Sequence, residues 1–591
     1  MTVDDGIDSA MTVAAIVVTF EAPDRLDQCL RSIVEQTKPP DVVVVVNNGS
    51  PAAAQRVVDF VRDANPAVAF DFVQSPYNSG PAGGHFIGMR RALEAGYDFF
   101  WVMDDDIVAE QNCLSALLSE CRMSDELLIV WPEQSIADGS VQNYPGWYGF
   151  LLSRAAVEAA GLPNRDLVWW IEDTEYLYQR LPSHGVRSER ASAARVMHGD
   201  GRPEGQKPPW KIFYETRNVL WYRIRVQRLR FPGRLIRAMG SLFKSAARSS
   251  QRSAASRALV AGVVEGLRGG LGQRWPLPVQ RLDETPMVPS GSRLNAFVMT
   301  YHREDRLVEH VEALMTQSVA PDRIIVVDNG NSSALAPMLT KFGDRVEIVT
   351  MPWNAGPAGA AAVGLRTLLG TSEWIYWGDD DQPPAPGAFE ALLDIADREQ
   401  AAAVASRGWL WSSRTGALRR AQPSSPSATT MNLDTTAGSM SLLIRSRSVQ
   451  AIGLPVPEMF WGFEDIEYLL RLRERNLRLV APPRPTNAQA GTSRAAPLEY
   501  PALPRTYYSV RNSIYMVVYC YKRPISGLIV SARAIVSAAR CAAKRPRYLA
   551  RVLRLTLRGI ADGWLGLLGE PMPLKSSDLR RDLLVPGVDH G

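Results

Sequence analysis

The strongest chemical signal in the sequence is a run of three consecutive aspartates that occurs twice. One run, residues 104–106, follows the aromatic and apolar segment 99–103, and the other, residues 379–381, follows a similar segment. In an extended backbone the first and third side chains of such a run point to the same side. Two carboxylates placed in this way suit a hard divalent cation that is shared with a diphosphate. A solvated acidic turn is the ordinary alternative, but the recurrence after a strand in both places favours metal binding.

An acidic Glu-Asp pair is the second signal, and it also occurs twice, at residues 172–173 and 464–465. Each pair begins a short amphipathic pattern, where an aspartate commonly caps a helix. Capping alone does not account for the aromatic residues that precede each pair. We predict that the second acid takes the proton of a sugar hydroxyl while the rings stack on the sugar. The candidates are Trp169, Trp170, Glu172 and Asp173 in the first half, and Trp461, Glu464 and Asp465 in the second.

A histidine is the third signal. His198 lies 25 residues after Asp173 and is one of six histidines in the chain. Imidazole is a common metal ligand, but a lone histidine is often structural, so on the residues alone both roles remain open. The same count from Asp465 reaches Ala490, where there is no histidine. The second acidic pair therefore lacks this candidate ligand.

These signals belong to a duplication of the sequence. Seven segments recur in the same order, and their offset drifts between 275 and 292 residues, as loop insertions and deletions would produce. Ordered recurrence of this kind indicates two copies of one structural unit. The paired segments are 13–20 with 294–301, 36–41 with 317–322, 44–50 with 325–331, 78–83 with 354–359, 101–106 with 376–381, 170–176 with 462–468, and 214–218 with 508–512.

Each copy begins with the pattern of an α/β fold. Continuous Val and Ile runs that alternate with amphipathic helices indicate a parallel sheet with helices on both faces. Functional loops are then expected at the carboxyl ends of the strands, where the aspartate runs lie. The predicted strands are 14–19, 42–46, 297–300 and 324–327, and the predicted helices are 24–36 and 305–317.

A stretch rich in Pro, Gly and Ser separates the copies, which is typical of a linker. We predict a first module at residues 1–275, a linker at 276–292, a second module at 293–570 and a tail at 571–591. Each module is expected to be a Rossmann-like domain with a mostly parallel central sheet, followed by a basic helical region.

Each half resembles the family 2 glycosyltransferases of GT-A fold, with a closer likeness to the galactofuranosyltransferase and rhamnosyltransferase branch. The likeness covers about residues 12–222 and 294–516 and depends on the ordered motifs above, together with the Tyr-x-x-Arg-Asn segment that ends each copy. It implies an inverting transfer from a UDP-galactofuranose or dTDP-rhamnose type of donor. It further implies Mn²⁺ or Mg²⁺ as cofactor, and a cell-surface glycan or a lipid-linked acceptor as partner.

The resemblance also implies roles for individual residues. The general bases would be Asp173 and Asp465. The metal ligands would be Asp104, Asp106 and His198 in the first module, and Asp379 and Asp381 in the second. The acceptor would contact Trp147, Trp169, Trp170, Glu172, Trp461 and Glu464. The donor would contact Thr19, Asn47, Asn78, Gly80, Asp104 and Asp105, and in the second module Thr300, Asp328, Asn354, Gly356, Asp379 and Asp380.

The copies differ at several of these positions. Asp328 matches the acid with which the family binds the nucleotide, whereas the first copy has Asn47. An aromatic platform at Trp147 aligns with the small, polar segment 438–441. We therefore expect different acceptors or linkages, and a bifunctional enzyme is the leading hypothesis. The alternative is that only the first module is catalytic and the second binds glycan or acts as a scaffold.

The basic residues are concentrated locally. The net charge is +4, with Arg and Lys clustered at about 217–274 and 505–558. This distribution suggests contact with an anionic membrane surface rather than with nucleic acid, although helices that pack on the sheet with solvated Arg faces explain it equally well. The lack of a CxxC pair, a signal peptide or a long apolar run favours a cytoplasmic protein with at most peripheral membrane contact. A nucleotidyltransferase is disfavoured, because residues 20–24 after the first strand contain no Gly.

Overall fold

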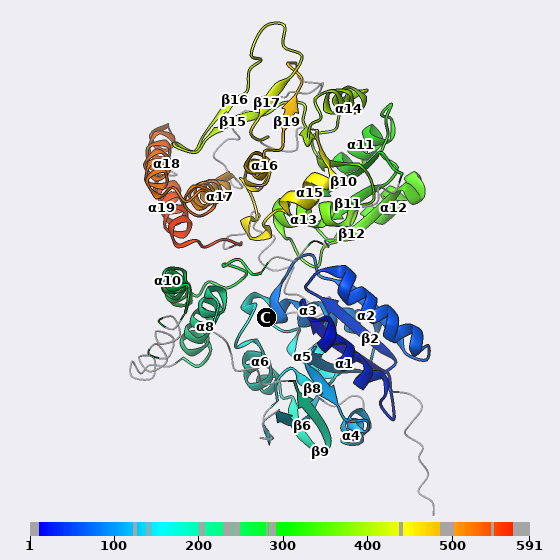
Figure 1. Cartoon of the computed structure of the whole chain (residues 1–591). Helices are drawn as coiled ribbons and strands as arrows, with labels where there is room; N and C mark the ends of the chain where they lie inside the picture. Colours follow the sequence, from blue (N-terminus) through cyan, green and yellow to red (C-terminus); the bar gives the residue numbers. More distant parts are fainter. Residues whose placement is uncertain are drawn as a thin grey trace, which may run out of the picture. The chain divides into compact units, whose positions relative to one another are not determined.

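The computed structural model describes residues 11–121, 127–136, 141–142, 145–199, 207–228, 240, 247, 249–278, 282, 291–436, 441–484, 502–544 and 549–570. The chain divides into two compact units, the first reaching Asp283 and the second running from Glu284 to Leu579. This boundary falls within the stretch 276–292 that the sequence suggests as a linker. Each unit is an α/β domain followed by helices (Figure 1), so the predicted fold class and the tandem arrangement are confirmed.

The first unit has a mixed central sheet with the strand order β3-β2-β1-β4-β8-β6-β9-β5, and β7 pairs with β6. The first four strands run parallel, and β8 joins β4 in the antiparallel direction. The carboxyl ends of β1, β2 and β4 therefore meet at one edge of the sheet. The strands are β1 (Val13–Thr19), β2 (Val42–Asn47), β3 (Ala69–Gln74), β4 (Phe99–Asp104), β5 (Ile107–Ala109), β6 (Leu128–Ile136), β7 (Val141–Gln142), β8 (Tyr148–Ser153) and β9 (Arg187–His198).

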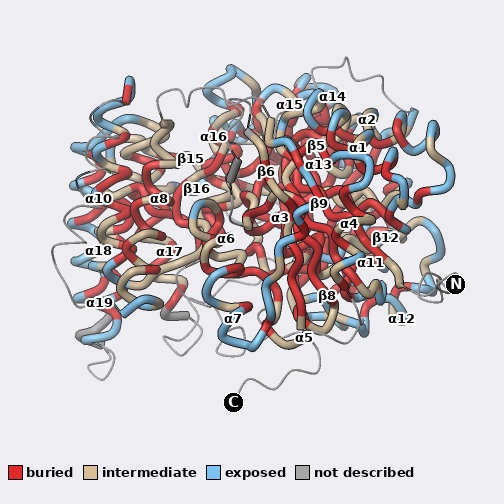
Figure 2. Tube along the Cα trace, turned by 90° about the horizontal axis from the view of Figure 1, so that it is seen from below, coloured by how far each residue is buried: buried red, intermediate tan, exposed pale blue. Residues whose placement is uncertain are grey.

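Helices cover both faces of this sheet. Successive side chains of a strand point to opposite faces, so the apolar residues of the buried strands need a covering helix on each side. On one face, Leu30 and Val58 pack with Val17 in a single core. On the other face, a Cβ added to Gly84 would lie only 2.4 Å from Cγ1 of Val18, so the start of a helix reaches the end of β1. Figure 2 shows the central strands as largely buried. The helices are α1 (Pro23–Val34), α2 (Pro51–Ala64), α3 (Gly80–Ala95), α4 (Cys113–Ser119), α5 (Arg154–Ala160), α6 (Glu172–Glu175) and α7 (Leu181–Ser183).

The second unit repeats this plan, with the strand order β12-β11-β10-β13-β18-β14-β19-β17. Strands β12, β11, β10 and β13 run parallel, and β18 joins β13 in the antiparallel direction. The strands are β10 (Leu294–Thr300), β11 (Ile324–Asp328), β12 (Val346–Thr350), β13 (Trp374–Asp379), β14 (Ala403–Val404), β17 (Met431–Leu433), β18 (Leu442–Arg445) and β19 (Leu479–Ala481), with a separate hairpin of β15 (Trp409–Ser412) and β16 (Ala417–Arg420). The helices are α11 (Glu304–Met315), α12 (Leu335–Leu339), α13 (Gly356–Leu368), α14 (Ala388–Arg398), α15 (Ser446–Ile452) and α16 (Glu464–Glu474).

A helical region follows each sheet. In the first unit α8 (Pro209–Trp221) packs along α10 (Arg252–Arg268), and in the second α17 (Ala502–Tyr515) packs along α19 (Leu549–Leu565), beside α18 (Pro524–Lys544). Much of the basic stretch that begins at residue 217 lies outside the described residues, as do the tail at 571–591 and most of the segment 438–441. Within the helices that the structure describes, none combines the length and the apolar character needed to cross a membrane.

The start of the linker suggested by the sequence belongs to the first unit. Leu277 is buried, and the carbonyl of Pro278 accepts a 3.0 Å hydrogen bond from Nδ2 of Asn78. Residues 276–278 therefore pack on the first domain, where they contact the loop that precedes α3.

Candidate functional site

Polar side chains gather where β1 and β4 of the first unit end. Thr19 is the last residue of β1, and its hydroxyl donates a 2.6 Å hydrogen bond to Oδ2 of Asp105. Asp104 is the last residue of β4, and the parallel pairing sets it opposite Val18. The sheet thus brings Thr19, Asp104 and Asp105 together. Burial raises the pKa of Asp105 to about 7.

Asp104 contacts a histidine that the sequence patterns did not indicate. His85 of α3 is fully buried, with Nε2 3.1 Å from Oδ1 of Asp104. Burial lowers the pKa of His85 to about 3 and raises the pKa of Asp104 well above its ordinary value. His85 lies two residues after the repeated segment 78–83, which is the one signal that could have found it. The second copy has Ala361 at this position.

The third aspartate faces His198. Strand β9 pairs with β5 so that His198 lies opposite Ile107. Ile107 is the residue that follows Asp106 in the chain, so the pairing brings His198 next to Asp106. Nε2 of His198 is 3.4 Å from Oδ1 of Asp106, a buried oxygen that has no hydrogen-bond partner among the described residues. Arg25 approaches the same carboxylate, with Nη1 3.6 Å from Oδ2. Two of the three residues that the sequence suggests as metal ligands in this unit, Asp106 and His198, therefore lie side by side.

Asp106 and His198 fit a divalent metal as two of its ligands. Burial alone would raise the pKa of Asp106, but its contact with His198 lowers it, and the same contact raises the pKa of His198. A carboxylate suits either Mn²⁺ or Mg²⁺, both of which also bind phosphate oxygens, and an imidazole beside it favours Mn²⁺ over the harder Mg²⁺. In the parts of the chain that the structure describes, no three His, Cys, Asp or Glu side chains are gathered closely enough to hold a metal. A metal here would therefore take its remaining ligands from the donor diphosphate.

The acidic pair of the first unit begins a short helix. Asp173 lies in the first turn of α6, and its Oδ1 accepts a 2.5 Å hydrogen bond from the backbone of Thr174. Glu172 is buried, and burial together with the charge of Asp173 raises its pKa well above the ordinary range. Because burial disfavours a negative charge on Glu172, the half-buried Asp173 is the better candidate for the proton acceptor.

The backbone that leads into α6 is strained. Three of the four residues 168–171 have a positive φ, between 66° and 74°, and such a conformation costs a residue with a Cβ roughly 1–3 kcal/mol. Asn218 stabilises this segment, residues 168–171, which we call the acid loop. The Nδ2 atom of Asn218 lies 2.8 Å from each of the carbonyl oxygens of Leu167, Trp169 and Trp170.

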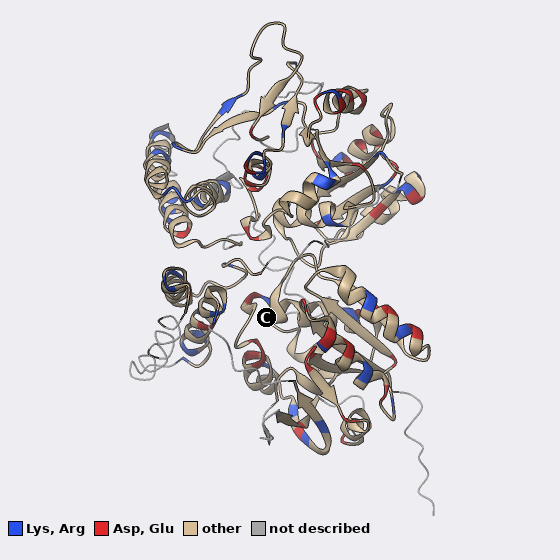
Figure 3. Ribbon diagram, viewed as in Figure 1, with Lys and Arg blue, Asp and Glu red and all other residues tan. Residues whose placement is uncertain are grey.

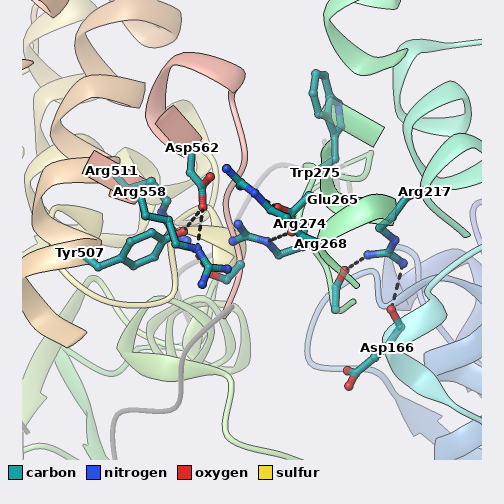
Figure 4. A network of polar contacts seen from close by, with 12 residues as sticks. Asp166, Arg217, Glu265, Arg268, Arg274, Trp275, Tyr507, Arg511, Arg558 and Asp562 are labelled. Atoms are coloured by element: carbon teal, nitrogen blue, oxygen red, sulfur yellow. Dashed lines mark hydrogen bonds and ion pairs between the residues drawn. The ribbon is translucent and has the colours of Figure 1, made fainter. Parts of the chain in front are cut away.

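The neighbouring Arg217 anchors the same loop (Figure 4). Its Nη2 donates to the carbonyls of Asp166 and Leu167 at 3.0 and 2.9 Å, and its Nη1 donates to that of Gly272. Its Nε donates to Oδ1 of Asn218 at 2.7 Å. The repeated Tyr-x-x-Arg-Asn segment, for which the sequence suggested no role, thus positions the acid loop. We call this pair of side chains the Arg-Asn frame.

The donor loop, residues 78–80, presses against the acid loop. Gly80 has a φ of 69°, and a Cβ at this position would lie 2.3 Å from the carbonyl oxygen of Val168. Asn48 ties the loop to the end of β2, because its Oδ1 accepts hydrogen bonds from Ser79 and its Nδ2 donates to the carbonyl of Gly80. Asn48 is a second residue that the sequence patterns did not single out. The suggested donor residue Gly80 therefore contacts the loop that carries the acid, and Oδ1 of the neighbouring Asn78 accepts a 3.1 Å hydrogen bond from the backbone of Gly80.

Asn47 and its counterpart Asp328 shape the turn after the second strand. Nδ2 of Asn47 donates to the carbonyls of residues 49–50 and to the side chain of Gln74. Asp328 accepts hydrogen bonds of 2.7–2.8 Å from backbone N–H groups within residues 330–332. A contact of either side chain with the donor remains a prediction.

Trp147 does not form the open platform that we expect from the sequence. It is only 4% exposed and stacks on His85, with 4.1 Å between the ring centroids. The reason is that it immediately precedes the central strand β8, so its ring packs inside the domain. Near the acid, Trp170 is 39% exposed, and Trp169 contacts Trp210 edge-on at 5.4 Å. These rings provide the aromatic surface instead.

In the second unit the corresponding residues line one cavity of about 490 Å³. This volume is within the range of small-molecule sites. The ends of β10 and β13, the start of α13 and the start of α16 form its walls. The residues suggested by the sequence that line it are Thr300, Asn354, Gly356, Asp379, Asp380, Asp381, Trp461, Glu464 and Asp465.

A cation from the start of α11 also lines this cavity. Nη1 of Arg303 lies 3.0 Å from Oδ1 of Asp380 and 3.0 Å from Oδ2 of Asp381. The hydroxyl of Thr300 donates to Asp380 at 3.0 Å, as Thr19 does to Asp105 in the first unit. The sequence comparison did not single out Arg303, because it is not part of a repeated motif.

The acid loop of the second unit is built in the same way as that of the first. Arg511 and Asn512 repeat the Arg-Asn frame, and Nδ2 of Asn512 donates to the carbonyls of Met459, Trp461 and Gly462 at 2.9, 3.0 and 2.6 Å. Burial and the charge of the adjacent Asp465 raise the pKa of Glu464 well above its ordinary value. A Cβ on Gly356 would lie 2.3 Å from the carbonyl oxygen of Phe460, so the donor loop and the acid loop touch here too.

The sequence profile of glycosyl transferase family 2 matches residues 14–145 and 296–448. The chain is similar to galactofuranosyltransferase GlfT1 of Mycolicibacterium smegmatis, with 28% identity over 30% of this chain and 64% of the relative. It is also similar to GlfT1 of Mycobacterium tuberculosis, with 34% identity over 27% of this chain and 51% of the relative. The matches thus span less than two thirds of these relatives' own length. A Pyrobaculum calidifontis mannosyltransferase structure is 15% identical over 44% of this chain and 78% of its own, with a TM-score of 0.29, which is too low to support an inference.

Proposed function

Because the chain belongs to glycosyl transferase family 2, with one domain of the family in each half, we propose that it is an inverting glycosyltransferase that uses nucleotide-diphosphate sugars. The donor is of the UDP-galactofuranose or dTDP-rhamnose class, and the acceptor is a cell-surface glycan or a lipid-linked glycan. The observation that carries the proposal is that the aspartate run, the donor loop and the acidic pair line one cavity in the second unit. The similarity to galactofuranosyltransferases supports the donor class.

The proposed reaction uses the acid as a base. Asp173, or Asp465 in the second unit, accepts the proton of an acceptor hydroxyl as the hydroxyl oxygen bonds to the anomeric carbon of the donor. The bond from that carbon to the diphosphate breaks, and the nucleoside diphosphate leaves with the electron pair. Attack from the opposite face inverts the configuration. Mn²⁺ or Mg²⁺ held by Asp106 and His198 would neutralise the charge on the leaving diphosphate in the first unit.

The two units are proposed to catalyse different transfers. Trp169, Trp170 and Trp210 form an aromatic cluster beside the acid in the first unit. The second unit has Trp461 with Arg505 over its ring, 5.3 Å from the ring centroid to Cζ. Acceptor sugars stack on aromatic surfaces, so different surfaces favour different acceptors or linkages. The alternative is that the second unit binds glycan without transferring to it.

We further propose a peripheral position on the cytoplasmic face of a membrane. Helix α18 exposes apolar side chains at helical spacing, with Ile525 and Leu528 76% and 61% exposed, followed by Ile529, Ile535 and Val536. Its buried side contains Ser531. Figure 3 shows Lys and Arg but no Asp or Glu along this helix. An exposed apolar stripe flanked by basic residues suits an anionic lipid surface.

The test is to incubate the protein with UDP-galactofuranose and dTDP-rhamnose, with Mn²⁺ or with EDTA, and to follow the anomeric configuration of the products by NMR. Asp173→Asn and Asp465→Asn are then compared separately. Loss of a different product in each variant is expected. If Asp465→Asn leaves every product unchanged, the bifunctional proposal is wrong. If both variants retain full transfer, the assignment of the bases is wrong.

A further inference from the structure

The two sites differ in the cation that faces the aspartate run. In the first unit His198 lies beside Asp106, but the sequence has no histidine between His310 and His590. His302 packs against Gly330 in the turn after β11, and His310 is fully buried and contacts the hydroxyl of Tyr376 at 3.1 Å. The second unit therefore has no imidazole that corresponds to His198. Its aspartate run is instead bound by the guanidinium of Arg303.

Arg303 occupies a position that the first unit leaves without charge. It is the N-cap residue of α11, with φ −141° and ψ 50°, and Ala22 is the N-cap of α1, with φ −133° and ψ 60°. The first unit has Arg25 nearby, but its contacts with the aspartates are 3.6 Å long, beyond hydrogen-bonding distance. Arg303 makes two contacts of 3.0 Å. A guanidinium therefore already binds both Asp380 and Asp381, so this pair does not fit a metal as Asp106 and His198 do.

Arg303 also retains donors for a ligand. Both contacts with the aspartates use Nη1, and among the described residues Nε and Nη2 have no hydrogen-bond partner. A guanidinium carries five N–H donors in a planar fork that matches phosphate oxygens. Because Arg303 lines the cavity, its remaining donors can bind a phosphate there.

A second guanidinium lines the same cavity. The Nε of Arg505 is buried and has no partner among the described residues. Burial and the charge of Arg303 lower the pKa of Arg505, so the two cations repel each other. An anion between two guanidinium groups would relieve this repulsion and satisfy the orphaned Nε.

We propose that the second unit binds the diphosphate of a nucleotide through Arg303 and Arg505 without a divalent cation, whereas the first unit requires one. This inference depends on the proposed function, because it assumes that the sites of both units accept a nucleoside diphosphate. It specifies that the two active sites differ in their need for metal.

The test measures binding of UDP and of dTDP to the full chain by isothermal titration calorimetry, in EDTA and in Mn²⁺. We expect one nucleotide per chain in EDTA and two in Mn²⁺. Arg303→Gln should weaken the binding in EDTA roughly ten- to hundredfold, since a hydrogen bond to a charged group contributes about 1.5–3 kcal/mol. Arg303→Lys should restore part of it. His198→Ala should remove only the Mn²⁺-dependent site.

A second readout counts the metal. Electron paramagnetic resonance should detect one nucleotide-dependent Mn²⁺ per chain in the wild type and in Arg303→Gln, and none in His198→Ala. Arg303 is half exposed, and thermal melting verifies that its variants fold. Two bound Mn²⁺ per chain, or binding in EDTA that Arg303→Gln leaves unchanged, overturns the inference while the proposed function stands. Failure of both nucleotides to bind under either condition overturns both.

Discussion

The hydrogen bonds of the Arg-Asn frame predict how much stability the first unit should lose when Asn218 is replaced. Replacing Asn218 by Asp keeps the shape and the oxygen that faces Arg217, but the amide that donates to three carbonyls becomes an acceptor. The NH2 group has two N–H donors shared among the three carbonyls. Each lost hydrogen bond costs about 1 kcal/mol, so the first unit should lose roughly 2 kcal/mol or more. At about 2–4 °C per kcal/mol for a domain of this size, its melting temperature should fall by roughly 4–8 °C.

The activity should fall further than the stability suggests. Without the hydrogen bonds of Asn218, the strained residues 168–171 can relax. Because Asp173 lies only two residues after this segment, the relaxation should move its carboxylate. A small displacement of a catalytic group commonly costs about a hundredfold in rate. We therefore expect kcat for the first product to fall at least tenfold, with a smaller change in KM for the donor.

The assay compares Asn218→Asp with its counterpart Asn512→Asp in the full chain, using differential scanning calorimetry and initial rates for each product. Each variant should destabilise its own unit and slow its own product, which makes each the control of the other. If Asn218→Asp melts within 1 °C of the wild type and retains its rate within about twofold, then this side chain does not hold the acid loop, and the account of the frame is wrong.

Three further changes test other parts of the structure. Gly80→Ala places a Cβ 2.3 Å from the carbonyl of Val168 and should reduce transfer by the first unit more than tenfold. Gly161→Ala also has a positive φ but nothing within 4 Å, so it should cost roughly 1–3 kcal/mol of stability and leave transfer intact. Equal rates in the two variants would contradict contact between the loops. The pKa of His310 is about 3 in the folded chain against an ordinary 6.5, so the folded state binds fewer protons and the second unit should lose up to roughly 5 kcal/mol as the pH falls from 6.5 to 3. Urea unfolding of His310→Leu should show a flatter pH dependence, and an unchanged slope would refute a buried neutral imidazole. Trp170→Ala should raise KM for the acceptor several-fold with little effect on donor hydrolysis, because only the stacking surface is lost; an unaffected acceptor KM would remove Trp170 from the acceptor site.

Features that follow from local periodicity could be predicted from the sequence. The Val run of β2 and the apolar run before Asp104 show that these segments are buried strands, and a strand end fixes where the next polar residue lies. The recurrence of the segments also showed the tandem arrangement, because a duplicated fold keeps the order of its motifs.

Features that depend on packing could not be predicted. His85 and Arg303 reach the aspartates from helices α3 and α11, and no spacing in the sequence connects them to the strand ends. Trp147 was misjudged because burial by β8 does not show in a single aromatic residue. The Arg-Asn segment was visible as a repeat, but its targets are backbone carbonyls about 50 residues away, which leave no side-chain pattern.

The frame has a consequence for how the duplicated gene could diverge. A backbone carbonyl is the same whatever side chain accompanies it, so Asn218 and Asn512 can hold loops of different composition. At the residues where the first copy has Trp170 and Ile171, the second has Gly462 and Phe463, yet φ is 73° and 74° in one and 76° and 72° in the other. Mutations that alter substrate preference can therefore accumulate in this loop without disturbing its shape. Such tolerance makes the duplicated architecture readily evolvable.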